Sequence, residues 1–409
     1  MIQKTFDALG KPDVDALIAD SVGESKTLEY KQELPGPKDD DKREFLADVS
    51  SFANASGGDI IYGIKAGVDA NGEKTGAPES VVPIVGITAD QAKLRLEEMI
   101  RNGIDPRLRV QIKEVTGWGA DGQGFVILLR IPKSFASPHM VTFKGTSRFF
   151  CRSSAGKYQL DVDELRTSFL ATESQAERIK RFREDRLGKI IADETPVMLS
   201  SPHRLVLHMI PLGPFLNNER LDLSNDRTLV HCFHPIRNAG SRYRYNLDGF
   251  VTFEPQRVKD QGHGSYCQVF FNSAVEAVFS EVLRRQGRER VRGGTGFIAS
   301  VAYEQYLIGA IESYLKGFGQ LGLTPPVALS LALLGCKGSF MYYVDSWGFP
   351  LDEPDPIDRD NVLLPDLVID SLDVDVPQTM RPVFDAVWNA CGFPRSLNYD
   401  KEGKWKPRG

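Results

Sequence analysis

Apolar positions in the first part of the chain change period several times, which predicts a mixture of helices and strands. A helix is predicted over 43–54, because apolar residues recur there at helical spacing and Gly57 and Gly58 follow as a helix stop. Another helix should begin at Thr88, since Gln91 completes the spacing of a capping box. Further predicted elements are a short helix over 14–18 and strands over 27–32, 59–64, 109–115 and 124–131. The expected fold class is therefore α/β or α+β, with helices packed on a mixed sheet.

A polar helical segment over 163–191 follows, and Thr195 and Pro196 mark the best candidate for a domain boundary. Beyond it, the predicted elements are strands over 204–210, 245–253 and 266–271 and apolar helices over 274–283 and 297–315. We therefore expect a domain over 1–170, a helical connector over 171–196, and a second α/β domain over 197–409. A sensor, specificity or oligomerisation role is expected for this second domain.

Composition narrows the class of protein. The chain has 409 residues, of which 41% are hydrophobic and 26% charged, as in ordinary globular proteins. No apolar run approaches the roughly 18 residues of a membrane span, the first residues lack an apolar signal segment, and five scattered cysteines form no disulfide framework. We therefore expect a cytoplasmic protein with no membrane association. The net charge of −5 argues against uniform coating of nucleic acid but allows a local basic site.

The stretch ESKTLEYKQEL, residues 24–34, concentrates charge on a predicted strand. Glu29 and Lys31 are two residues apart, so they point to one face of the strand. This pair suits phosphodiester hydrolysis, in which the acid holds a metal ion and the ammonium positions water or offsets developing charge. Glu24 can share that ion only if the chain bends between the two acids. The alternative is a solvated strand, on which such charged pairs are common.

Two segments resemble the Schlafen AlbA_2 domain family. The first, Gly23 to Lys31, reads GESKTLEYK, and the second, Phe45 to Ile64, reads FLADVSSFANASGGDIIYGI. The resemblance extends from about residue 15 to about residue 170 and includes FFCR at 149–152, which is similar to the family's late strand bearing an arginine. Residues 197–409 resemble no family that we recognise.

The resemblance implies a metal-dependent endoribonuclease that cuts tRNA or other structured RNA and acts in antiviral defence, with Mg²⁺ or Mn²⁺ as cofactor. Glu24 and Glu29 fall at the positions of the family's metal-binding acids, and Lys31 would be the catalytic charge partner. A third acid is expected after Ile64, but the chain reads KAGVD there, so this acid is missing or displaced to Asp69.

The resemblance leaves other functions open, because many bacterial members are described only as DNA-binding or ATP-binding proteins. The alternatives are a non-catalytic DNA-binding or transcription-regulatory protein and an interaction scaffold. Between Lys144 and Lys189 there are eleven Lys or Arg against seven Asp or Glu, a local basic excess of four. This excess favours an RNA or DNA groove, although an ordinary charged helix face fits it equally. The expected nucleic-acid contacts are Lys144, Arg148, Arg152, Lys157, Arg181 and Arg183.

Asp48 is interpreted as a solvated helix position, away from the apolar stripe. Glu29 has a structural alternative, in which it pairs with a buried arginine and its loss destabilises the fold. A homodimer or higher oligomer is expected, because eukaryotic Schlafens carry two such modules in one chain and only one is recognised here.

Overall fold

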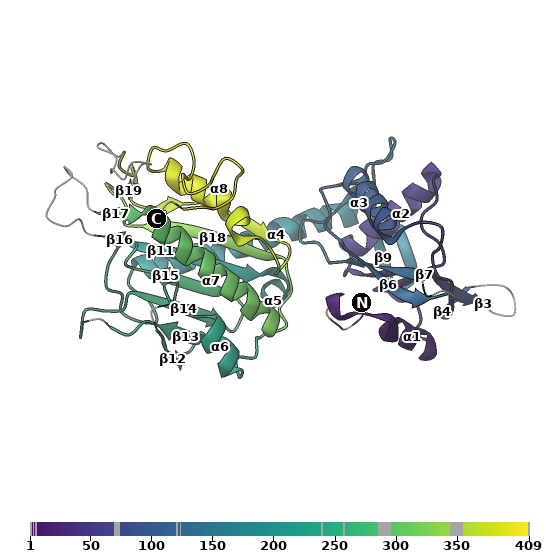
Figure 1. The fold of residues 1–409 in the computed structure, drawn as a ribbon, viewed down its shortest axis with the longest axis horizontal. Coiled ribbons are helices and arrows are strands. Elements are labelled where there is room, and N and C mark those ends of the chain that lie inside the picture. Colours follow the sequence, from purple (N-terminus) through teal and green to yellow (C-terminus); the bar gives the residue numbers. More distant parts are fainter. Residues whose placement is uncertain are drawn as a thin grey trace. The chain divides into compact units, whose positions relative to one another are not determined.

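The computed structural model describes the chain apart from residues 1, 3, 5, 69–73, 120, 121, 123, 239, 257, 285–295, 344–354, 408 and 409. The chain forms two compact units, Met1–Ala176 and Glu177–Gly409. The division falls inside helix α4 (Val162–Ile191). Both units mix helices with strands, which confirms the predicted α/β class (Figure 1).

The first unit contains a short 3₁₀ helix, helices α1 to α3, strands β1 to β10 and the start of α4. Their bounds are Phe6–Ala8 (3₁₀), α1 Lys11–Ala19, β1 Leu28–Lys31, α2 Asp39–Asn54, β2 Gly58–Tyr62, β3 Ile64–Val68, β4 Lys74–Val81, α3 Ala89–Gly103, β5 Ile104–Asp105, β6 Gln111–Trp118, β7 Gly124–Ile131, β8 Met140–Val141, β9 Arg148–Ser153 and β10 Gly156–Gln159.

The principal sheet of the first unit has the order β1-β2-β7-β6. It is mixed, because β1 runs parallel to β2 while β7 is antiparallel to both β2 and β6. Successive side chains of β2 point to opposite faces. Ile60 and Tyr62 pack with residues of α2 and α3, whereas Ile61 packs with Val14 of α1. Helices α2 and α3 therefore cover one face and α1 the other.

A second sheet, of order β10-β9-β8-β5, is antiparallel throughout. Val141 of β8 belongs to the same apolar cluster as the buried face of α2. Helix α2 also packs against β9. The helix thus has the principal sheet on one side and β8 and β9 on another.

The ends of α2 and α3 follow local chemistry. Helix α2 begins at Asp39, four residues before the predicted start at Arg43. The first turn holds three aspartates, whose charges stabilise the positive end of the helix dipole. At α3, Gln91 donates its backbone N–H to Thr88 Oγ1 and accepts the Thr88 N–H, both at 3.2 Å. These bonds confirm the predicted capping box.

The second unit contains the end of α4, helices α5 to α8 and strands β11 to β21. Their bounds are β11 Arg204–Pro211, α5 Leu212–Asn217, α6 Asp226–Cys232, β12 Arg242–Tyr245, β13 Gly249–Phe253, β14 Ser265–Phe270, β15 Val275–Phe279, β16 Leu283–Arg284, β17 Phe297–Ala299, α7 Ser300–Gln320, β18 Val327–Leu334, β19 Phe340–Tyr342, β20 Val362–Leu363, β21 Leu367–Ile369 and α8 Val376–Asn389.

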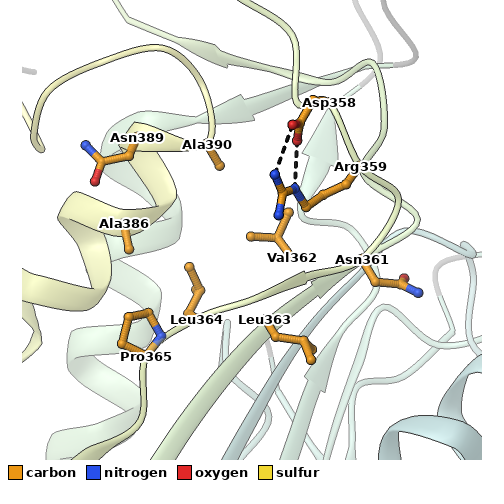
Figure 2. Close-up of a pocket in the computed structure, with 10 residues that line it drawn as sticks. All are labelled: Asp358, Arg359, Asn361, Val362, Leu363, Leu364, Pro365, Ala386, Asn389 and Ala390. Atoms are coloured by element: carbon orange, nitrogen blue, oxygen red, sulfur yellow. Dashed lines mark hydrogen bonds and ion pairs between the residues drawn. The ribbon is translucent and has the colours of Figure 1, made fainter.

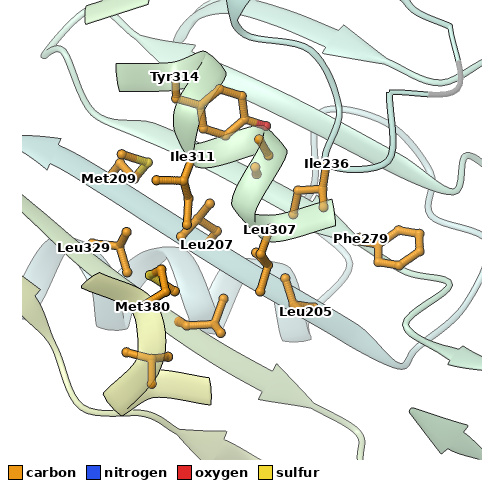
Figure 3. Packing of buried hydrophobic residues seen from close by; sticks show 14 of the residues in the cluster. Leu205, Leu207, Met209, Ile236, Phe279, Leu307, Ile311, Tyr314, Leu329 and Met380 are labelled. Atoms are coloured by element: carbon orange, nitrogen blue, oxygen red, sulfur yellow. The ribbon is translucent and has the colours of Figure 1, made fainter. Parts of the chain in front are cut away.

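An eight-stranded sheet forms the centre of the second unit, with the order β12-β13-β14-β15-β11-β18-β20 and β21 paired to β18. Leu205 and Leu207 of β11 pack against Leu307 and Ile311 of α7 (Figure 3). Val206, which points to the opposite face, packs with residues of α4. Helix α7 therefore covers one face of this sheet and the end of α4 covers the other.

The predicted helix over 274–283 is wrong, since strand β15 (Val275–Phe279) occupies most of this range. Every residue of β15 is buried, because α7 covers one face of the sheet and α4 the other. A strand buried on both faces reads as a continuous apolar run without alternation. Ser273, with a φ of 72°, lies in the turn that reverses the chain before β15.

Candidate functional site

Glu29 and Lys31 lie on β1 and point toward α2. Their spacing of two residues places both side chains on one face of the strand. The neighbouring Tyr30 packs with the α1 side of the sheet, so Glu29 and Lys31 face the α2 side. Glu29 is 9% exposed. The sequence thus places a charged pair on β1 against the buried side of α2.

Five charged side chains converge here: Glu29, Lys31, Asp48, Arg152 and Lys157, named the charged cluster below. Lys31 Nζ lies 2.6 Å from Glu29 Oε1 and 3.0 Å from Asp48 Oδ2. Asp48 Oδ1 lies 2.7 Å from Lys157 Nζ, and Glu29 Oε2 pairs with Arg152. Each oxygen of the two carboxylates therefore has a cationic partner.

Electrostatics keep Lys31 charged. Burial alone would lower the pKa of Lys31, but the carboxylates of Asp48 and Glu29 raise this pKa above its ordinary value. Burial raises the pKa of Asp48, with help from the negative charge of Glu29. For Glu29, burial would raise the pKa, yet Lys31 and Arg152 outweigh it and hold the pKa below its ordinary value. Lys31 is thus the shared counter-ion of two acids.

Arg152 lies inside the first unit. It is 8% exposed, pairs with Glu29 and stacks its guanidinium 4.0 Å from the centre of the Phe52 ring. The enclosed guanidinium of Arg152 therefore already has partners inside the fold, and its predicted contact with nucleic acid stays a prediction. The structural alternative for Glu29, a pair with a buried arginine, matches this arrangement.

The structure corrects the interpretation of Asp48 as a solvated helix position, because Asp48 is only 3% exposed. Positions 45, 48 and 52 of a helix share one face, so Asp48 lies between Phe45 and Phe52 on the buried side of α2. This spacing is the signal by which the sequence could have identified it. An acid on an otherwise apolar stripe indicates a partner on the element packed against it.

Of the predicted metal ligands, Glu24 and Glu29 interact with different partners. Glu24 is exposed, and its Oε1 accepts the backbone N–H of Tyr30 at 2.8 Å. Asp69 lies outside the described residues. Among the residues that the structure describes, no group of three or more His, Cys, Asp or Glu is placed to hold a metal ion. A divalent ion at Glu29 and Asp48 would also meet the positive charges of Lys31, Arg152 and Lys157. The residues of the charged cluster therefore do not fit a Mg²⁺ or Mn²⁺ site.

A hollow of about 740 Å³ opens beside the charged cluster, where the first turns of α2 meet the loop between β8 and β9. It is named the α2 hollow. The residues that line it are Asp40, Arg43, Glu44, Ala47, Val141, Gly145, Thr146, Ser147, Arg148, Phe150 and Lys157. Two of the predicted nucleic-acid contacts, Arg148 and Lys157, are thus brought together, and Lys144 is in the loop that forms one wall.

Most cations around the α2 hollow are neutralised. Lys144 pairs with Asp39 at 2.7 Å, Arg43 pairs with Asp40 at 2.7 Å, and Lys157 pairs with Glu44 as well as Asp48. Arg148 is exposed and makes no ion pair within the described part of the chain. Its guanidinium is therefore available to an anionic ligand.

The remaining predicted contacts belong to the second unit. Arg181 is exposed and pairs with Glu177 at 3.1 Å, one turn away on α4. Arg183 is largely buried and pairs with Asp366. The six predicted basic residues are accordingly divided among the α2 hollow, the interior of the first unit and the second unit.

A further hollow, of about 530 Å³, lies in the second unit (Figure 2). The residues that line it are Asp358, Arg359, Asn361, Val362, Leu363, Leu364, Pro365, Ala386, Asn389 and Ala390. Its two charged side chains, Asp358 and Arg359, pair with each other at 2.7 Å (Figure 2). The hollow therefore presents little uncompensated charge.

Glu276 is a buried acid that the sequence did not reveal. Arg186 of α4 donates two hydrogen bonds of 2.8 Å to its carboxylate, and the Tyr266 hydroxyl donates a third at 2.8 Å. His208 Nε2 lies 3.0 Å from Oε2. Burial alone would raise the pKa of Glu276, but Arg186 and His208 outweigh it and lower the pKa to about 2. Glu276 of β15 thus links the end of α4 to the eight-stranded sheet.

Glu304 of α7 is a second buried acid, and neutral donors surround it. Oε1 accepts hydrogen bonds from Trp388 Nε1 at 2.8 Å and Ser396 Oγ at 2.7 Å. Oε2 accepts from Asn398 Nδ2 at 2.9 Å and Trp405 Nε1 at 2.7 Å. Burial raises the pKa of Glu304, although these bonds oppose the shift. The Glu304 carboxylate thus connects α7 to α8 and to residues 396–405.

No helix in the described ranges is long and apolar enough to cross a membrane.

The family model described as Schlafen, AlbA_2 matches residues 24–161. These residues include β1, α2 and β9, which carry the charged cluster. No curated protein matches the chain.

Eighteen chains of solved structures match this chain. One is the DIP2311 protein from Corynebacterium diphtheriae, with 20% identity and a TM-score of 0.23 over 36% of this chain. The match spans 26% of that protein's chain. Another is the N-terminal domain of a protein from Nitrosomonas europaea described as ATP-dependent DNA helicase RecG-related, with 16% identity and a TM-score of 0.25. That match covers 36% of this chain and 85% of the other.

Proposed function

Because residues 24–161 belong to the Schlafen AlbA_2 family, we propose that the first unit binds nucleic acid and that Arg148 contacts the phosphate backbone. The observation that carries the proposal is the exposed, unpaired guanidinium of Arg148 at the α2 hollow, within the described part of the chain. Phosphate contacts in such proteins come chiefly from Arg and Lys, and they position the nucleic acid without reading its sequence.

The surroundings of Arg148 explain why it should contribute more to phosphate binding than the neighbouring lysines. The ammonium groups of Lys144 and Lys157 already have carboxylate partners, so a phosphate gains less from them. A free guanidinium offers two parallel N–H groups to one phosphate, a strong charge-assisted arrangement. Gly145, Thr146 and Ser147 line the hollow together with Arg148.

Binding to tRNA and to duplex DNA over a series of salt concentrations tests the proposal. Arg148→Glu should weaken binding to every sequence by about fivefold or more and lower the salt slope by about one. The matched control is Lys11→Glu, because Lys11 is a partly exposed cation on α1, on the other face of the principal sheet. Equal affinities and slopes for the two variants would refute the contact.

The narrower candidate is a metal-dependent endoribonuclease that cuts tRNA or other structured RNA, with a role in defence against phage. The convergence of Glu29 and Asp48 on Lys31 favours this function, since two acids from β1 and α2 meet at one cation. The three cations of the charged cluster oppose it, because they occupy the carboxylates that a divalent ion would need. Binding without metal-dependent cleavage is therefore our first proposal.

Cleavage of total tRNA with Mg²⁺ or Mn²⁺ separates the two candidates. Cutting by the wild type that is lost in both Glu24→Gln and Glu29→Gln would support the endoribonuclease. Binding of tRNA without cutting would support the first proposal.

Self-association extends the proposal, since a homodimer would place two AlbA_2 domains on one nucleic acid. Light scattering with and without tRNA is the test. A monomer in both conditions would reject the dimer and leave the Arg148 contact untouched.

A further inference from the structure

Ser134 and His139 meet in the loop between β7 and β8. Ser134 Oγ lies 2.6 Å from His139 Nε2, and His139 Nδ1 lies 2.7 Å from the backbone oxygen of Pro106. His139 is 1% exposed, whereas Ser134 is only half-buried. A half-buried serine, whose Oγ also accepts the Ala136 N–H at 3.1 Å, thus lies against an enclosed imidazole.

The partner of Nδ1 fixes the direction of both hydrogen bonds. A carbonyl oxygen can only accept, so Nδ1 carries the hydrogen and Nε2 of the neutral ring keeps its lone pair. The Ser134 hydroxyl must then donate to Nε2. Burial lowers the pKa of His139, although the bond to Pro106 and the charge of Asp105 oppose the shift. The ring is therefore neutral and able to accept a proton at pH 7.

The backbone holds both residues in place. The Ser134 N–H donates to Ala53 O at 3.0 Å, and the His139 N–H donates to Asn54 Oδ1 at 2.7 Å. Asn54 Nδ2 in turn donates to His139 O at 2.9 Å. Gly57, with a φ of 72°, lets the α2–β2 turn approach this loop, since a Cβ there would lie 2.5 Å from Lys133 N. The end of α2 thus fixes the serine, the imidazole and their separation.

We propose that Ser134 is a nucleophile toward carboxylic esters, with His139 as its general base and Pro106 O orienting the base. This order of nucleophile, base and orienting group is the signature of an activated serine. The site lies outside the charged cluster and the α2 hollow, so the inference is independent of nucleic-acid binding.

The reaction balances without a cofactor. Ser134 Oγ attacks the ester carbonyl carbon while its proton passes to His139 Nε2. The alcohol then leaves and takes that proton, which gives an acyl-serine and a neutral ring. Water, deprotonated in the same way by His139, attacks the acyl carbon, and Ser134 recovers its proton as the carboxylic acid departs.

A fluorophosphonate probe tests the nucleophile on the full chain. Ser134 Oγ should bond to phosphorus with loss of fluoride, and peptide mass spectrometry should locate the adduct. Ser137 is the internal control, because it is half-buried on the same loop. We expect labelling of Ser134 at roughly 100-fold the rate of Ser137, within the usual contribution of a general base.

Two comparisons establish the role of the geometry. Unfolding the wild type in urea removes the arrangement without a mutation and should equalise the two serines. His139→Gln should slow Ser134 labelling by a similar factor while its melting curve reports the fold.

With p-nitrophenyl acetate as substrate, Ser134→Ala should abolish the burst of nitrophenolate. Equal labelling of Ser134 and Ser137 in the folded wild type, or preference that survives in urea, would overturn the proposal.

Discussion

Glu29 of β1 and Arg152 of β9 form a buried ion pair that joins the principal sheet of the first unit to its β10-β9-β8-β5 sheet. Their side chains are 11% and 8% exposed, so water screens the pair little. Desolvation makes such a pair a weak source of net stability, yet removal of one partner leaves an uncompensated buried charge. The pair therefore makes Glu29 a structural requirement even where no chemistry depends on it.

Glu29→Gln should destabilise the first unit by about 3 kcal/mol, because Arg152 loses its counter-charge inside the fold. Urea unfolding followed in first-unit peptides by hydrogen exchange would measure this loss. Glu24→Gln is the control, since Glu24 is exposed and an amide oxygen can still accept the Tyr30 N–H. A Glu29→Gln protein as stable as the control would show that the ion pair contributes nothing.

Lys31→Met should create a response to Mn²⁺ that the wild type lacks. The change removes the cation shared by Glu29 and Asp48 and leaves the two acids with only Arg152 and Lys157. An ion that binds the folded state stabilises it, by about 2.7 kcal/mol at a concentration of 100 Kd. Thermal melting with and without millimolar Mn²⁺ is the measurement. If Mn²⁺ raised the wild-type melting temperature as much as that of the variant, our view of Lys31 as a competing cation would fail.

The second unit should lose stability in acid through Glu276. Its pKa is lowered from 4.5 to about 2 in the folded state, so the unfolded chain binds the proton first as the pH falls. The contribution, roughly 3 kcal/mol by linkage, is complete above pH 4.5 and disappears as the pH approaches 2. Urea unfolding across this range should show a steeper decline for the wild type than for Glu276→Gln. Identical slopes would contradict the assignment.

His139 should make the stability of the first unit depend on pH closer to neutrality than Glu276 does for the second unit. Burial holds its folded-state pKa below the ordinary 6.5, so the unfolded chain takes up the proton first as the pH falls through 6.5. The stability due to the neutral ring is therefore present above 6.5 and lost below it. Hydrogen exchange of first-unit peptides between pH 8 and 5 should reveal this loss. His139→Gln, which does not titrate, should flatten the curve, and a slope unchanged in that variant would reject the role of His139.

Short-range sequence signals predicted the helices of the first unit well. The capping box of Thr88 and Gln91 depends on neighbours three residues apart, and so it appears in the sequence itself. The apolar pattern places the start of α2 too late, because the first turn holds three polar aspartates, which the dipole favours at a helix N-terminus. Local chemistry of this kind depends on where the helix begins, which the apolar pattern alone did not determine.

Long-range partners account for the errors at the candidate site. Arg152 lies 123 positions after Glu29, and no local pattern distinguishes a buried arginine from one that contacts phosphate. Asp48 could have been recognised from its place on the Phe45 and Phe52 face, but its cationic partners come from β1 and β10. Similarly, the sequence pattern predicts a helix at β15, because burial from both sides removes the alternation of a strand. Tertiary packing decided these positions.

Glu304 has a consequence for the order of synthesis. Its donors Ser396, Asn398 and Trp405 follow it by 92, 94 and 101 residues. At about 5–20 residues per second, translation supplies them roughly 5–20 s after Glu304 has been made. During that interval the carboxylate must remain hydrated, so the α7 surface that will enclose it stays open. A nascent chain stopped before Ser396 should therefore be cut by protease in its second unit, whereas one extended past Trp405 should resist, and equal resistance would mean that the last donors arrive at a core already closed.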